Sequence, residues 1–118
     1  MADDFTNLRI WQLGFRLLKK VYILSDQFPK AETYALTDQI RRSANSVTAN
    51  IAESSGRYHK KDKIKVLYYA RGEIHETKSH LLVAKELGYC KAELVDGIVF
   101  EYSTLLKQVN TFIKVIAN

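Results

Sequence analysis

Residues that interrupt helices are scarce in this chain. Proline occurs once, at Pro29, and glycine occurs five times in 118 residues. A β-sandwich or β-barrel of this length needs many turns that contain Gly or Pro, so their scarcity favours helices. The breaks separate four segments by a few residues each, which is typical of antiparallel neighbours in a bundle. We therefore expect an all-α fold in one domain (residues 1–118), an antiparallel up-down-up-down four-helix bundle with helices at about 8–27, 32–55, 61–87 and 92–116.

Each segment carries apolar residues at helical spacing. The last segment has the clearest pattern, because steps of three and four alternate over three heptads, as in an a/d seam; it consists of Val95, Ile98, Tyr102, Leu105, Val109, Phe112 and Ile116. The third segment repeats the spacing with Leu67, Ala70, Ile74, Thr77, Leu81 and Ala84. The second has Leu36, Ile40, Ala44, Val47 and Ile51. In the first we expect a seam of Leu8, Trp11, Phe15, Leu18 and Tyr22, flanked by Leu17, Val21, Leu24 and Phe28.

The first and last segments carry more apolar surface than one bundle seam requires. A second stripe, Val99, Leu106 and Ile113, lies beside the seam of the last segment. A monomeric bundle could bury part of this surface by curvature. A second interface between copies of the chain explains it more directly, so we favour self-association.

The chain is basic, with 18 Lys and Arg against 13 Asp and Glu, a net charge of +5. Residues 1–31 hold +2 of this charge and residues 59–88 hold +3, whereas the other two portions are neutral. We take as candidate nucleic-acid-binding residues Arg41, Arg42, Arg57, Lys60, Lys61, Lys63, Lys65, Arg16, Lys19 and Lys20, with Tyr58 interleaved among them. Lys60 and Lys61 stand at an expected helix N-terminus, where an anionic partner would offset the unfavourable dipole. The alternative is that these lysines only keep the surface solvated.

No motif for catalysis or for metal and cofactor binding is found. The single cysteine, Cys90, cannot form an internal disulfide, and the three histidines lack the paired spacing of a zinc helix. There is no glycine-rich phosphate loop or nucleophile elbow. We expect no enzymatic activity, no metal and no cofactor. No apolar run approaches the ~20 residues of a membrane span, and the acidic N-terminus does not look like a signal peptide, so we expect a cytoplasmic protein.

The second segment contains a long motif, Gln39-Ile-Arg-Arg-Ser-Ala-Asn-Ser-Val-Thr-Ala-Asn-Ile-Ala-Glu53, followed by Gly56-Arg57. It resembles the signature of the 23S rRNA intervening-sequence proteins, also called four-helix-bundle proteins. Further matching pieces, in order, are Leu8-Arg-Ile-Trp-Gln12, Val21-Tyr22, Phe28-Pro29, Glu32, Tyr34-Ala-Leu36, Ala70-Arg71-Gly72, Glu76 and Leu87-Gly88-Tyr89. The motif residues that we single out are Gln39, Arg42, Asn50, Glu53, Arg71 and Glu76. The chain departs from the family pattern at Thr48, usually proline, and at Ser54, usually glycine.

The resemblance implies a bundle that assembles as a ring, a homopentamer, and it implies no enzymatic activity. Family members are encoded within insertions in bacterial large-subunit ribosomal RNA genes and elsewhere in bacterial genomes. They resemble the accessory proteins of diversity-generating retroelements, pentameric barrels that bind nucleic acid and a reverse transcriptase. Our leading hypothesis is a small oligomeric protein that binds RNA or DNA through backbone charge. The alternative is a protein-interaction scaffold, an accessory subunit for a nucleic-acid enzyme such as a reverse transcriptase.

Overall fold

The structure, a computed structural model, describes residues 4–118 and contains no strand in that range. Its elements are the 3-10 turn η1 (Phe5–Asn7), α1 (Arg9–Ser25), the 3-10 turn η2 (Lys30–Glu32), α2 (Leu36–Gly56), α3 (Lys60–Glu86) and α4 (Ala92–Ala117). The predicted all-α class and the four helices are confirmed. Residues 1–3 lie outside the described residues, and so does the start of the acidic N-terminus on which the expectation about a signal peptide rests. None of the described helices is long and apolar enough to cross a membrane.

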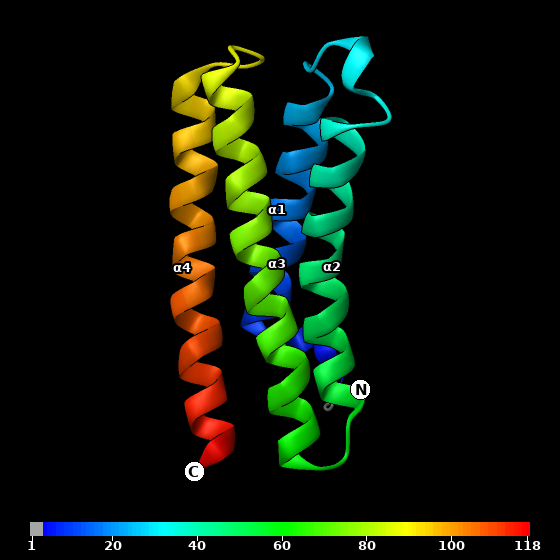
Figure 1. Cartoon of the computed structure of the whole chain (residues 1–118). Helices are drawn as coiled ribbons and strands as arrows, with labels where there is room; N and C mark the ends of the chain where they lie inside the picture. The colour runs from blue at the N-terminus through cyan, green and yellow to red at the C-terminus, as the bar shows by residue number, and fades with distance from the viewer. Residues whose placement is uncertain (1–3) are drawn as a thin grey trace.

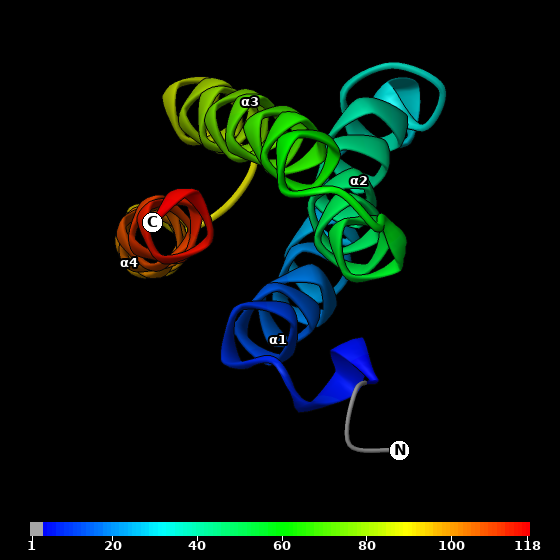
Figure 2. The ribbon, with the colours of Figure 1, turned by 90° about the horizontal axis from the view of Figure 1, so that it is seen from below.

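The helices lie along the long axis of a molecule that measures 44 × 23 × 23 Å. α1 contacts α2 and α4, and α3 contacts the same two helices from the opposite corner. In Figure 1 the start of α1, the α2–α3 connection and the C-terminus lie at the lower end. The α1–α2 and α3–α4 connections lie at the upper end. Figure 2, viewed from below, shows the four helices around a common centre, with the widest gap between the ribbons of α1 and α4.

The buried face of α1 differs from the expected one. Phe15 and Tyr22, placed in the predicted seam, are 41% and 44% exposed, and Trp11 is only partly buried. The buried side chains of α1 are instead aliphatic: Ile10, Leu13, Leu17, Val21 and Leu24. The residues expected to flank the seam, such as Leu17, Val21 and Leu24, therefore face the core. α1 turns its aliphatic side toward the other helices, and its aromatic side chains lie at the edge of the bundle.

The predicted stripes of α2 and α3 are confirmed, since all their members are buried. On α4 the predicted seam is buried as far as Val109. Beyond it Phe112 and Ile116 are only partly buried, and Ile113 is buried instead. A straight α-helix drifts by about 20° per heptad from a strict 3.5-residue repeat, which moves the inward position from one stripe to its neighbour.

The upper end is fixed by a contact between residues distant in sequence. α2 begins at Leu36 rather than near 32, because residues 30–32 form the separate turn η2. The Glu32 carboxylate accepts a hydrogen bond from the backbone N–H of Leu36, the first residue of α2, at 3.2 Å. The Tyr89 hydroxyl donates to the other oxygen of Glu32 at 2.7 Å, and this bond raises the pKa of Tyr89. α3 ends at Glu86, close to the expected residue 87, and Gly88 follows its C-cap Leu87. The φ of +74° at Gly88 lets the Tyr89 N–H reach the Ala84 carbonyl.

Two interior helix glycines make a matched pair that tests the packing of α1 on α2. Gly72 is exposed with open space around it, so Gly72→Ala should raise the free energy of unfolding by about 1 kcal/mol. At Gly14 a Cβ would lie 3.2 Å from the Thr48 methyl, so Gly14→Ala should lose much of that gain. Urea denaturation measures both, and an equal gain at the two positions would contradict the close approach of α1 and α2.

Candidate nucleic-acid interface

The net charge of the molecule is concentrated at one end. When each helix is divided at its middle, residues 4–16, 47–72 and 105–118 form the lower end in Figure 1. This end, which we call the basic end, has ten basic and three acidic residues, a net charge of +7. The upper end, residues 17–46 and 73–104, has eight basic and nine acidic residues, a net charge of −1. The chain alternates between the ends, so the separation is invisible when charge is summed along consecutive segments.

Five of the predicted basic residues are exposed at the basic end, and four of them form no ion pair within residues 4–118. Lys60, Lys61 and Lys65 occupy the first turns of α3 and are exposed, and within residues 4–118 they form no ion pair. Arg16 on α1 is also exposed and unpaired in the described part of the chain. The fifth, Arg57, forms an ion pair with Glu53 but stays on the surface of this end. These cations are available to an anionic ligand.

Lys63 has a structural role that was not predicted from the sequence. Its ammonium group donates to the carbonyl oxygens of Ser54 at 3.1 Å and Ser55 at 3.4 Å. These carbonyls belong to the last turn of α2, where the regular helical hydrogen bonds end. The Ser54 carbonyl also accepts a long hydrogen bond of 3.4 Å from the N–H of the C-cap residue Arg57. Lys63 therefore caps α2, and its charge also complements the negative end of that helix dipole.

The other predicted cations lie in the half of the molecule with the smaller net charge, and each has a local partner. Lys20 pairs with Glu101 at 2.6 Å, joining α1 to α4, and the ammonium group of Lys19 lies over the Phe15 ring. Arg42 pairs with Asp38 within α2 at 3.1 Å. Arg41 pairs with Asp26 at 2.8 Å and also donates to Ser25 Oγ. The structure thus does not bring the ten predicted residues into one patch.

Three exposed tyrosines lie among the free lysines of the basic end. Tyr58, Tyr68 and Tyr69 are 89%, 52% and 53% exposed. Only Tyr58 is among the residues predicted from the sequence. The signal for the other two was available, because they follow Lys65 by three and four residues and so neighbour it on the surface of α3.

The family-motif residues of α2 and α3 lie on the outer surface and form mostly contacts within their own helix. Glu53 pairs with Arg57, the Asn50 amide donates to the Ser46 carbonyl at 2.8 Å, and Glu76 lies 3.6 Å from His80. The remaining members are likewise on the surface or paired locally: Arg42 with Asp38, Arg71 over the Tyr68 ring, and Gln39 exposed. These six motif residues thus lie outside the core of the subunit, whereas the apolar motif residues Ile40, Ala44, Val47 and Ile51 are buried in it.

A shallow polar groove separates α2 from α3, lined by Arg42, Ser43, Asn45, Ser46, Ala49, Glu73 and Glu76. Burial raises the pKa of Glu73, the neighbouring Glu76 raises it further, and His80 opposes the shift. Glu73 and Glu76 are the carboxylates that line this groove, and its lining includes no histidine. In residues 4–118 no group of three His, Cys, Asp or Glu side chains is arranged to hold a metal ion.

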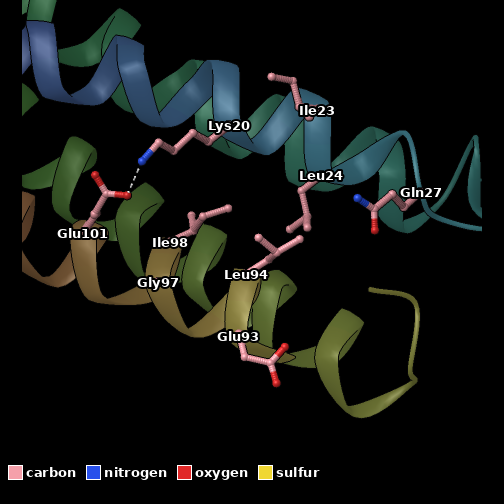
Figure 3. Close-up of a pocket in the computed structure, with 9 residues that line it drawn as sticks. All are labelled: Lys20, Ile23, Leu24, Gln27, Glu93, Leu94, Gly97, Ile98 and Glu101. Carbon is pink, nitrogen blue, oxygen red and sulfur yellow. Dashed lines mark hydrogen bonds and ion pairs between the residues drawn. The ribbon is translucent and has the colours of Figure 1, made fainter. Parts of the chain in front are cut away.

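A second groove, of about 350 Å³ and mainly apolar, lies between α1 and α4 (Figure 3). Leu24 and Leu94 approach each other across it, and the Lys20–Glu101 ion pair spans it at one side. Gly97 adds no side chain to the α4 wall, where a Cβ would meet nothing within 4 Å. This groove is the part of the surface suited to apolar contact rather than to phosphate.

Replacing Lys63 tests whether this residue stabilises the C-terminal end of α2. Lys63→Met should lower the free energy of unfolding by about 1 kcal/mol, because two α2 carbonyls lose a charged donor at a partly exposed site. Lys60→Met removes the same charge from a residue without such bonds and should change stability by less than about 0.5 kcal/mol. Urea denaturation compares the two variants, and an equal effect would show that Lys63 does not cap α2.

Comparison with known proteins agrees with the fold and the motif. The profile of the family described as 23S rRNA-intervening sequence protein matches residues 6–111. A solved structure from Bacteroides thetaiotaomicron, described as a protein with unknown function from the S23 ribosomal protein family, superposes with a TM-score of 0.82. That match covers 89% of this chain and 98% of the other at 23% identity. No curated protein matches significantly. The chain belongs to the 23S rRNA-intervening sequence protein family.

Proposed function

We propose that this chain is a non-enzymatic, oligomeric protein that binds nucleic acid, RNA or DNA, through phosphate contacts at its basic end. The observation that carries the proposal is the separation of charge, +7 at one end and −1 at the other. Free lysines at a surface of one sign attract a polyanion and release its counterions. Lys60, Lys61 and Lys65 meet this requirement, because none of them is neutralised within the described chain.

The assembled form that we propose is a homopentameric ring of antiparallel up-down-up-down bundles, as the family resemblance implies. Exposed apolar side chains on α1 and α4 support self-association, among them Ile23 and Phe100, which is 72% exposed. In a ring with cyclic symmetry all subunits point the same way. The five basic ends would then lie on one rim, where their phosphate contacts add.

The second candidate is an accessory scaffold for a nucleic-acid enzyme such as a reverse transcriptase. The apolar groove between α1 and α4 favours it, because a protein partner needs apolar surface that phosphate binding does not use. This function is compatible with a cytoplasmic location, since the single cysteine needs no oxidising compartment. Co-purification of a protein partner that binds a groove variant more weakly would favour the scaffold.

Charge reversal at the two ends tests the binding proposal. The triple variant K60E/K61E/K65E should weaken binding of a fluorescently labelled 20-nucleotide strand at least tenfold and reduce its salt dependence, because phosphate contacts are lost. The matched control K30E/K78E/K91E changes the net charge equally at the other end and should have a much smaller effect. Anisotropy titrations measure both, with circular dichroism as the check on helicity. Equal losses would contradict a site at the basic end.

Native mass tests the ring. Five subunits of 13.6 kDa give an assembly of about 68 kDa. Static light scattering on the purified protein should return this mass at micromolar concentration. A mass of one subunit that persists at high concentration would contradict self-association, whereas a closed assembly of another size would contradict only the number five.

A further inference from the structure

We infer that the basic end is a site for single-stranded nucleic acid, in which the rings of Tyr58, Tyr68 and Tyr69 stack on unpaired bases while Lys60, Lys61 and Lys65 contact the backbone. This inference rests on the proposed nucleic-acid function and adds to it the class of nucleic acid. The inference rests on the exposure of the tyrosine rings and on the lack of ion pairs at the three lysines within the described residues.

The three tyrosines expose aromatic rings that do not contribute to the packing of the bundle. None of them packs in the core of the bundle, and all three lie within twelve consecutive residues at the junction of α2 and α3. A single exposed aromatic residue is ordinary, but a group of them marks a surface that contacts a ligand. Their neighbours are cations rather than exposed aliphatic residues, so the surface suits a polyanion with aromatic groups better than an apolar protein segment.

Rings and charges alternate along this surface. Lys61, Lys65 and Tyr68 share one stripe of α3, at steps of four and three residues, over about 10 Å of helix. The guanidinium group of Arg71 lies 5.4 Å from the centre of the Tyr68 ring. Sequence-tolerant binding of single strands uses such a combination, a cationic track for the backbone with rings that accept bases of any kind.

The bases of a duplex are stacked on each other, so their faces are closed to protein side chains. Only a single strand or an unpaired loop presents a base face to Tyr58, Tyr68 or Tyr69. Phosphates, in contrast, are present in both forms. The tyrosines should therefore discriminate single strands from duplexes, and the lysines should not.

The aromatic row of α1 does not offer the same faces. Phe5, Trp11 and Phe15 contact one another at 5.2 and 5.1 Å between ring centres, and Lys19 covers Phe15. Tyr22 is covered by the guanidinium group of Arg41 at 4.7 Å. Phe15 and Tyr22 are 41% and 44% exposed, less than the 89%, 52% and 53% of Tyr58, Tyr68 and Tyr69. Tyr58 and Tyr68 have neighbours too, the His59 ring at 5.0 Å and the Arg71 guanidinium group, but they keep more of their surface uncovered.

Three probes and two triple variants test the inference by fluorescence anisotropy. The probes are a 20-nucleotide oligo-dT strand, a 20-base-pair duplex and a 20-unit abasic strand, which keeps the phosphates but has no bases. Y58A/Y68A/Y69A should lower affinity for oligo-dT roughly tenfold or more and the affinity for the duplex less than twofold. Y58F/Y68F/Y69F keeps the rings and should bind oligo-dT as the wild type does. Y34A, which removes a ring at the other end that is more exposed than any of the three, is the control.

The outcomes separate stacking from charge. The wild-type protein should bind the abasic strand about as weakly as the alanine variant binds oligo-dT, a comparison that does not depend on how the variant folds. Equal wild-type affinity for the abasic strand and oligo-dT, or an equal loss for duplex and single strand in the alanine variant, would overturn stacking and leave phosphate binding intact. Failure of the wild type to bind any of the three probes would overturn the proposed function and this inference together.

Discussion

The fold depends on one aliphatic layer that all four helices share along the full length of the molecule. Its fully buried members include Leu17 on α1, Ile51 on α2, Ile74 on α3 and Leu105 on α4. Isolated helices of this length are marginal in water, so each is held mainly by the burial of its apolar stripe. Because the layer uses only the inward faces, the outer faces and the two ends carry charge without disturbing it. The separation of charge along the bundle is compatible with the core for this reason.

Helical periodicity predicted the fold class and the buried stripes of α2 and α3, where a single apolar arc exists. It failed on α1, because two apolar arcs lie side by side there and spacing alone cannot tell which one faces inward. When the aliphatic arc of α1 faces inward, Gly14 lies close to Thr48 on α2 and Phe15 lies at the edge of the bundle. On α4 the drift from Phe112 to Ile113 is a property of a straight helix that a strict heptad does not anticipate.

The candidate site was predictable only in part, because its geometry depends on how the helices pack against one another. The basic residues can be counted from the sequence, but their partners lie on other elements. Lys20 meets Glu101 across 81 positions of the chain, and Lys63 meets backbone carbonyls, which no side-chain pattern reveals. Alternation of the chain between the two ends hides the charge separation from any count along consecutive residues. Once the helices are placed, Lys60, Lys61 and Lys65 lie together at the basic end and form no ion pair within residues 4–118.

The account divides the surface into a basic end for phosphate and base contact, an apolar groove between α1 and α4, and motif residues outside the core of the subunit. Its central claim is that nucleic acid occupies the basic end. Hydrogen–deuterium exchange with and without a 20-nucleotide strand tests this most directly. The account predicts slower exchange in residues 57–69 and unchanged exchange in residues 28–38 at the opposite end. Protection confined to residues 28–38, or along the α1–α4 groove, would contradict it.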